Sequence, residues 1–342
     1  MSVIETIPVA KIFSEYFDIK IITRISVIDD FWEPPKFSFV YFIETIDNEH
    51  FVMKLISDHT FSRQQNEDQI EFSEYLRSKG VPTARFFPLI NSDGKYCYET
   101  DLHHLYENAR AFVSLQEYVG RDIKSINLIN ITAIGRLIGL SHSFGKSFHR
   151  KLPLNFALRA LYNGKTEFDQ IWSGINTSNE VWQPLRKVHK KSIKTIIEVI
   201  HKLPCSAVHG DLGLTSNVLM DSKGTFRIID FNLSGRCPCL LDFLITWYSS
   251  RYQQDFIGEV RSVEMAEQYR NAYISSYSKY YRLNTLEKEN INILSKCLNG
   301  IYLSRFIAGL IREGLHISDK SLMIDFLAKG YTQVDSFFAW RD

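Results

Sequence analysis

Residues 207–235, AVHGDLGLTSNVLMDSKGTFRIIDFNLSG, combine a His-Gly-Asp run, an asparagine and an Ile-Asp-Phe run within one short segment. Between the asparagine and the last aspartate lie two short β-rich pieces, which are joined by the turn-forming run Asp-Ser-Lys-Gly. The segment therefore predicts a loop that carries Asp211 and Asn217, followed by a hairpin that ends at Asp230.

The sequence before this segment is rich in β-forming residues. Residues 37–56 read as two strands around an Asp-Asn-Glu-His turn, and a polar, helix-compatible stretch at 64–79 ends at Gly-Val-Pro. Residues 86–100 are expected to form two more strands around Asn-Ser-Asp-Gly, and 111–119 a further strand. We therefore expect residues 1–120 to form a mostly antiparallel sheet with one helix.

Helical periodicity dominates the rest of the chain. Apolar residues recur at helical spacing within 130–148, and 180–202 continues in the same style. No repeat, low-complexity tract or linker rich in proline and glycine interrupts the sequence. The predicted fold class is α+β, with a hinge near residues 120–122 between the N-terminal lobe and a mostly helical lobe, 121–342.

Composition limits the partners that the protein can have. The 342 residues include 40 basic and 39 acidic ones, so the formal net charge of +1 gives no electrostatic reason to expect nucleic acid or an anionic membrane surface as a partner. The N-terminal run MSVIETIPVAKIF contains an acid and no long apolar region, and no segment approaches the roughly 20 apolar residues of a membrane span. We expect a cytoplasmic protein with a small-molecule partner.

The five cysteines are odd in number and widely separated, which favours reduced thiols over a disulfide framework. Cys237 and Cys239 flank a proline, but no second Cys or His pair with zinc-ligand spacing stands near them in sequence. Zinc binding is therefore not expected.

The polar residues of the opening segment match the needs of phosphoryl transfer. That reaction requires the nucleotide phosphates to be held, Mg²⁺ to be placed between them, and the acceptor hydroxyl to be oriented and relieved of its proton. Asp211 can accept the proton, Asn217 and Asp230 can offer oxygen ligands to Mg²⁺, and Lys54, on a predicted strand, can neutralise phosphate charge. The four residues follow the chain order of the protein-kinase signature set.

HGDLGLTSN, the IIDF run and Asp242, twelve residues after Asp230, resemble the aminoglycoside phosphotransferase and choline kinase-like family. The segments GVPTARF, LQEYVG and IGRLIGLSH follow in the family's order. The resemblance implies a two-lobed protein-kinase-like fold and a Mg²⁺- and ATP-dependent kinase, with GTP as the other possible donor. The implied acceptor is a hydroxyl of a small molecule, either an antibiotic such as an aminoglycoside, which would confer resistance, or a metabolite such as an amino alcohol.

The resemblance also implies roles for single residues. Asp211 resembles the catalytic base and Lys54 the phosphate-binding lysine, while Asp242 resembles a buried brace of the catalytic loop. The remaining implied site residues are the metal ligands Asn217 and Asp230, the adenine-binding backbone of Glu117 to Val119, and Ser38 at the tip of the phosphate-covering loop PPKFSFV.

Two departures from the kinase pattern leave alternatives open. The asparagine is expected five residues after the aspartate, but Ser216 stands there and Asn217 follows it, so either residue can supply the metal ligand. The helix glutamate that should pair with Lys54 falls near Gln69, between two candidate acids, Glu67 and Glu71. These departures motivate a second hypothesis, a nucleotide-binding pseudokinase with a regulatory role.

The acceptor is less well defined by the sequence. A polycationic antibiotic requires clustered carboxylates. Acids that could provide them are interspersed with arginines after Leu240: Asp255, Glu259, Glu264 and Glu267, among Arg251, Arg261 and Arg270. The near-zero net charge gives no further indication of the acceptor.

Overall fold

The computed structural model describes residues 7–18, 21–90, 92–103, 105, 108–123, 126–150, 152–163, 183–213, 216–251 and 263–312. The chain divides into two compact units. The first comprises Met1–Arg121, His149–Pro153 and Leu219–Asn232, and the second Asp122–Phe148, Leu154–Val218 and Leu233–Asp342. Among the residues described, no helix combines the length and the apolar character that crossing a membrane requires.

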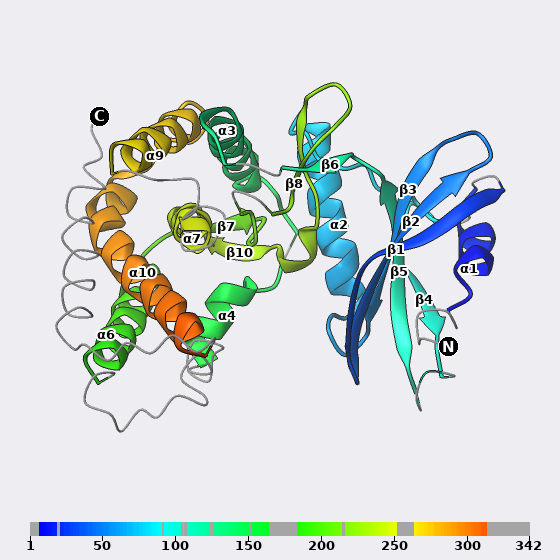
Figure 1. Ribbon diagram of the computed structural model, residues 1–342, viewed down its shortest axis with the longest axis horizontal. Helices are drawn as coiled ribbons and strands as arrows, with labels where there is room; N and C mark the ends of the chain where they lie inside the picture. Colours follow the sequence, from blue (N-terminus) through cyan, green and yellow to red (C-terminus); the bar gives the residue numbers. More distant parts are fainter. Residues whose placement is uncertain are drawn as a thin grey trace. The chain divides into compact units, whose positions relative to one another are not determined.

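The first unit is built on a five-stranded antiparallel sheet with the strand order β1-β2-β3-β5-β4 (Figure 1). The predicted hairpin at 37–56 forms, and a long edge strand that the sequence analysis did not anticipate is added in front of it. The strands are β1 (Ile22–Glu33), β2 (Lys36–Thr45), β3 (His50–Ser57), β4 (Tyr98–Asp101) and β5 (Arg110–Glu117).

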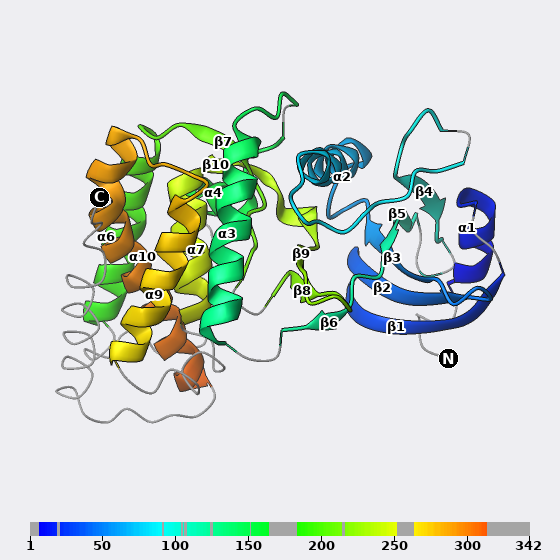
Figure 2. The same cartoon turned by 90° about the horizontal axis from the view of Figure 1, so that it is seen from above.

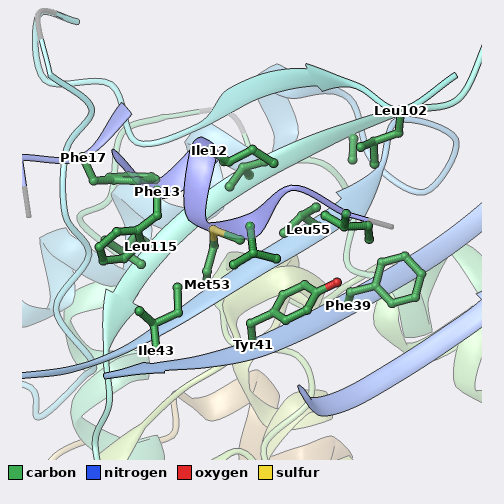
Figure 3. Close-up of a cluster of buried hydrophobic side chains, with 14 of the residues drawn as sticks. Ile12, Phe13, Phe17, Phe39, Tyr41, Ile43, Met53, Leu55, Leu102 and Leu115 are labelled. Atoms are coloured by element: carbon green, nitrogen blue, oxygen red, sulfur yellow. The ribbon is translucent and has the colours of Figure 1, made fainter. Parts of the chain in front are cut away.

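The core of the first unit lies between this sheet and a short helix, α1 (Val9–Tyr16) (Figure 3). Strand side chains alternate between the two faces of a sheet, so Met53 and Leu55 point toward α1 while Lys54, between them, points to the opposite face. Phe13 and Phe39 are both fully buried in this core, and each such burial contributes about 2 kcal/mol. The core thus fixes the direction in which Lys54 projects.

The predicted helix at 64–79 is α2 (Arg63–Ser78). It begins with a capping box, in which the Ser62 hydroxyl accepts the Gln65 N–H and the Gln65 side chain accepts the Ser62 N–H. Gly80 follows the helix with a φ of 83°, the left-handed conformation that commonly ends helices. Phe72 then packs edge-on against Phe231, so α2 is anchored on the segment that follows Asp230.

Residues 86–100 differ from the expected pair of strands, because β4 is the only strand that the described residues of this range form. Pro88 has no N–H to donate, which prevents a regular ladder over the first half of the stretch. The backbone there makes isolated bonds instead, from the Phe87 N–H to the Leu115 carbonyl and from the Leu89 N–H to the Lys95 carbonyl. Short bridges therefore replace the first predicted strand.

The second unit is mostly helical. Its described elements are α3 (Leu128–Gly145), α4 (Phe156–Asn163), α6 (Gln183–Ile200), α7 (Cys239–Arg251), α9 (Val263–Ser278) and α10 (Thr285–Arg312), with an antiparallel pair, β7 (Cys205–Val208) and β10 (Gly235–Pro238). Figures 1 and 2 show α7 lying among α3, α9 and α10. Gly135 and Gly139 allow α3 and α9 to approach closely, because a Cβ at Gly139 would lie 2.7 Å from the Tyr277 carbonyl oxygen.

The predicted hairpin of the opening segment also forms. Its strands are β8 (Val218–Met220) and β9 (Phe226–Ile228), which share a small sheet with β6 (Arg121–Asp122) and are followed by the 3₁₀ turn η2 (Phe231–Leu233). The predicted fold class is confirmed: the N-terminal part is an antiparallel sheet, and the C-terminal part is mostly helical. The five cysteines are all unpaired, and only Cys205 is exposed.

Candidate active site

Asp211 and Asn217 are brought together by the loop that follows β7. The Asn217 Nδ2 donates to the Asp211 main-chain carbonyl at 2.8 Å and to the Asp211 Oδ2 at 3.0 Å. Asn217 has a φ of 61°, a left-handed conformation that asparagine tolerates better than most residues. Both bonds use the amide nitrogen Nδ2 of Asn217, so neither of them engages the amide oxygen, Oδ1.

The backbone before Asp211 admits only glycine. Gly210 has a φ of 87°, and a Cβ there would collide with the Asn155 amide and lie 2.6 Å from the Leu233 carbonyl oxygen. The buried His209 accepts the Asp211 N–H at its Nδ1, at 3.3 Å. The His-Gly-Asp run is therefore held by a ring nitrogen on one side and by a close backbone approach on the other.

Asn155 is a structural support of this loop that the sequence analysis missed. It is 2% exposed, donates from Nδ2 to the Leu233 carbonyl at 2.8 Å, and accepts the Ala157 N–H at Oδ1. It therefore joins the start of α4 to the turn after Asp230 and closes the space beside Gly210. An asparagine immediately before a helical run is a helix-cap signal that could have been found in the sequence.

Ser216, the alternative metal ligand, lies within the same loop. Its hydroxyl lies against Gly213, where a Cβ would collide with Oγ, and its carbonyl accepts the Gly213 N–H at 3.2 Å. Ser216 is thus packed back on the loop, whereas Asn217 reaches Asp211.

Lys54 and Asp230 meet in the first unit. Lys54 Nζ lies 2.8 Å from Asp230 Oδ1, and the two side chains are 17% and 35% exposed. Asp230 has a φ of 57°, so the chain turns sharply between β9 and η2 and directs its carboxylate out of the strand. The sheet face opposite the α1 core therefore holds one cation and one carboxylate in contact.

The helix glutamate expected to pair with Lys54 is not found among the described residues. Glu67 accepts the backbone N–H groups of Tyr96 and Cys97, and Glu71 pairs with Arg150. The Gln69 side chain donates to the Asn232 carbonyl. All three α2 side chains are engaged elsewhere, and the ionic partner of Lys54 is Asp230.

Glu117 and Val119 lie at the end of β5, where adenine binding was predicted. The Glu117 N–H donates to the Arg85 carbonyl at 2.9 Å, and the Tyr118 N–H donates to the His50 carbonyl at 3.1 Å. No backbone hydrogen bond among the described residues uses the Val119 N–H. Ser38, which was expected at a loop tip, lies inside β2 opposite Ile56, and the turn itself is formed by Pro34 and Pro35.

Asp242 begins a buried hydrogen-bond chain in the second unit. Its Oδ2 lies 3.0 Å from His142 Nε2, and His142 Nδ1 lies 3.0 Å from the Tyr277 hydroxyl. The chain links α7, α3 and α9, and Asp242 is only 2% exposed. Among the described residues, the carboxylate of Asp242 therefore braces helices rather than the loop directly.

Tyr302 and Arg305 of α10 mark the side of the second unit near Asp211. Burial first, and the carboxylates of Asp211 and Asp242 as well, raise the pKa of Tyr302 to about 12, while Arg305 acts in the opposite direction. The Arg305 guanidinium lies 5.7 Å from the centre of the Tyr302 ring. No motif in the sequence marks these two residues, because helical periodicity alone does not show which turn of α10 lies near Asp211.

The acidic residues considered for the acceptor are only partly visible. Asp255 and Glu259 lie outside the described residues, as does Arg261, while Glu264 and Glu267 belong to α9. No group of three or more His, Cys, Asp or Glu side chains that could hold a metal ion occurs in the described part of the chain.

Comparison with solved structures identifies the fold as that of small-molecule kinases. Amicoumacin kinase hAmiN, solved with AMP-PNP, Ca²⁺ and Ami, is similar with a TM-score of 0.65 at 14% identity over 96% of this chain and 92% of its own. A microcompartment-associated aminopropanol kinase gives 0.64 at 14% identity, covering 96% of both chains. An aminoglycoside phosphotransferase from Alicyclobacillus acidocaldarius gives 0.60 at 13%, covering 97% and 94%.

The family follows from the sequence itself. The profile of the Phosphotransferase enzyme family, APH, matches residues 34–283, which is most of the chain. The protein therefore belongs to this family and is a small-molecule phosphotransferase, and the predicted resemblance is confirmed. No curated protein matches the chain in sequence.

Proposed function

We propose that the protein is an ATP- and Mg²⁺-dependent kinase that phosphorylates a hydroxyl group of a small molecule, with Asp211 as the base. The observation that carries this proposal is the pair of hydrogen bonds from Asn217 to Asp211. They fix an exposed carboxylate and, beside it, an amide oxygen that remains able to bind a metal.

The proton transfer is assigned to Asp211. The acceptor oxygen bonds to the γ-phosphorus as the bond from that phosphorus to the β,γ-bridging oxygen breaks, the nucleoside diphosphate leaves, and the hydroxyl proton passes to the Asp211 carboxylate. The Asn217 N–H bond to Oδ2 orients this carboxylate, and Gly210 and His209 hold its backbone. A base that is fixed before the substrate binds needs little reorganisation during the reaction.

Asp230 and Asn217 are the residues that would hold Mg²⁺. Mg²⁺ prefers oxygen ligands and usually keeps waters and phosphate oxygens beside one or two protein carboxylates, so one carboxylate and one amide oxygen fit it. When bound, the ion neutralises charge on the phosphates. The 2.8 Å contact between Lys54 and Asp230 supports the assignment of Lys54 as the residue that pairs with a phosphate oxygen beside the metal.

The end of β5 supports adenine as the base. The N–H and C=O of one strand residue point to the same side, and neighbouring residues alternate. The Glu117 carbonyl and the Val119 N–H therefore lie on the side to which the Glu117 N–H points, toward Arg85. A carbonyl and an N–H in this order match the amino donor and ring acceptor of adenine, whereas guanine offers a carbonyl and an N–H in the reverse order.

The acceptor of the proposed reaction is a small molecule with a hydroxyl group. Two classes of acceptor remain within the proposal, an antibiotic such as an aminoglycoside and a metabolite such as an amino alcohol.

The test is acceptor-dependent ADP formation with a panel of hydroxylated antibiotics and amino alcohols, with ATP or GTP, in the presence of Mg²⁺ or EDTA. We expect ADP formation that needs one acceptor class and Mg²⁺, with ATP preferred over GTP. Tight Mg·ATP binding without transfer to any acceptor would instead favour the pseudokinase hypothesis.

A further inference from the structure

One arginine of the β8–β9 hairpin joins two carboxylates of the first unit. Arg227 Nη1 lies 2.6 Å from Glu117 Oε1, and Arg227 Nε lies 3.1 Å from Asp221 Oδ2. The three side chains are 31%, 30% and 11% exposed. Glu117 ends the strand that carries the proposed adenine site, whereas Asp221 and Arg227 belong to the hairpin that leads to Asp230.

Both carboxylates that Arg227 contacts also accept hydrogen bonds from backbone N–H groups, which hold them in place independently of Arg227. The Arg85 N–H donates to Glu117 Oε1 at 2.9 Å. Asp221 Oδ1 accepts the N–H groups of Lys223 at 2.9 Å and Thr225 at 2.8 Å, and these bonds, that of Thr225 first, together with Arg227 hold the pKa of Asp221 below its usual range. Arg227 therefore spans two anchored charges rather than two mobile side chains, as in a strong, oriented ion pair.

A second contact joins the same two segments. Gly120, just beyond the adenine-binding backbone, has a φ of 149°, and a Cβ there would collide with the Met220 carbonyl oxygen and lie 3.1 Å from Asp221 Cα. The strand end and the hairpin are thus in backbone contact at Gly120 and in ionic contact at Arg227. The two segments are therefore held to each other at two places.

We propose that Arg227 is a positioning residue that fixes the base-binding end of β5 relative to the hairpin that ends at Asp230. The inference rests on the proposed function, because it assumes that nucleotide binds at Glu117 to Val119 and at Asp230. ATP contacts both places at once, so its affinity depends on how well their separation is set in advance. A ligand that contacts only the phosphate end does not depend on it.

The experiment compares Mg·ATP with Mg·tripolyphosphate, which lacks the base and the ribose. Binding of each is measured by calorimetry for the wild type, Arg227→Met and Arg227→Lys. Arg110→Met is the matched control, since Arg110 begins the same strand and pairs with Glu99 at 2.9 Å with its side chain 56% exposed. Steady-state kinetics give the KM values for nucleotide and acceptor separately.

For Arg227→Met we expect about fivefold weaker binding of Mg·ATP and a matching rise in nucleotide KM, with tripolyphosphate binding and acceptor KM changed by less than about twofold. Arg227→Lys keeps the charge but cannot span both carboxylates, so it should fall between Arg227→Met and the wild type. This milder variant also provides the comparison if Arg227→Met does not fold. The Arg110→Met control should match the wild type.

Equal weakening of both ligands, or no change in either, would overturn the inference while the proposed function stands. A wild-type protein that binds tripolyphosphate and ATP equally well would overturn it too, because no base site would exist to be positioned. Failure of the wild type to bind any Mg·nucleotide would refute the proposed function itself, and the inference with it.

Discussion

Lys54 Nζ and Asp230 Oδ1 lie 2.8 Å apart although 176 positions separate the two residues in the sequence. The pair joins the middle of β3 to the turn after β9. Under the proposed function, nucleotide binding exchanges this contact, because Lys54 is then assigned to phosphate and Asp230 to the metal. The ion pair holds the charged groups of Lys54 and Asp230 next to each other.

Replacing Lys54 by methionine should therefore affect nucleotide binding far more than folding. A partly exposed ion pair contributes about 0–1 kcal/mol to stability, whereas loss of a phosphate contact should weaken Mg·ATP binding by about tenfold or more. Calorimetry and chemical denaturation measure the two effects. Lys79→Met, which removes a lysine lying 5.5 Å from the Tyr75 ring centre, is the control and should change neither quantity. Unaltered ATP affinity in Lys54→Met would contradict the assigned role.

The choice between Asn217 and Ser216 as metal ligand can be made by titrating Mg²⁺. Asn217→Ala should raise the Mg²⁺ concentration for half-maximal turnover by about tenfold or more, and it should lower kcat because the bonds to Asp211 are lost. Ser216→Ala should leave the Mg²⁺ dependence within about twofold. The reverse pattern would assign the metal to Ser216.

Gly210→Ala tests the close packing before the base. It should destabilise the second unit by at least about 2 kcal/mol, because the added methyl group meets Asn155 and the Leu233 carbonyl at a left-handed backbone position. Gly224→Ala is the matched comparison, since Gly224 has a φ of 78° but no atom within 4 Å of the added Cβ. It should cost about 1 kcal/mol from backbone strain alone. Urea denaturation of both variants separates crowding from strain, and equal losses would refute the crowding.

Asp242→Ala should act on stability. It removes one partner of a buried hydrogen bond and leaves His142 Nε2 without its acceptor, at a cost of about 3 kcal/mol. Glu198→Ala, whose side chain is 62% exposed in the same unit, should change stability by less than about 0.5 kcal/mol. A fully stable Asp242→Ala protein with reduced turnover would mean that Asp242 acts on the reaction instead.

Local patterns predicted the elements that depend on neighbouring residues. The hairpins at 37–56 and 217–229 have turn residues between β-rich runs, and α2 has both its capping box and its terminal glycine in the sequence. Edge strand β1 was missed because its burial does not alternate, so its sequence lacks the usual period of two. The first half of 86–100 was assigned to a strand although Pro88 removes a ladder donor.

Side-chain partners were the harder part, because they depend on contacts between distant segments. Kinase-like order suggested an α2 glutamate for Lys54, yet Glu67 is drawn to the Tyr96 and Cys97 N–H groups and Asp230 takes its place. No sequence motif marks Arg227, because its two carboxylate partners are identified only by the contacts between the hairpin and β5. The sequence shows which residues are charged, but it does not show which acidic side chain pairs with which basic one.

The most direct test of the proposed chemistry is a comparison of turnover and nucleotide binding in Asp211→Asn. The amide keeps the size of the side chain but cannot accept the hydroxyl proton, so kcat should fall by about a hundredfold or more while the Kd for Mg·ATP stays within about threefold of the wild type. Turnover at the wild-type rate in Asp211→Asn would contradict the assignment of Asp211 as the base.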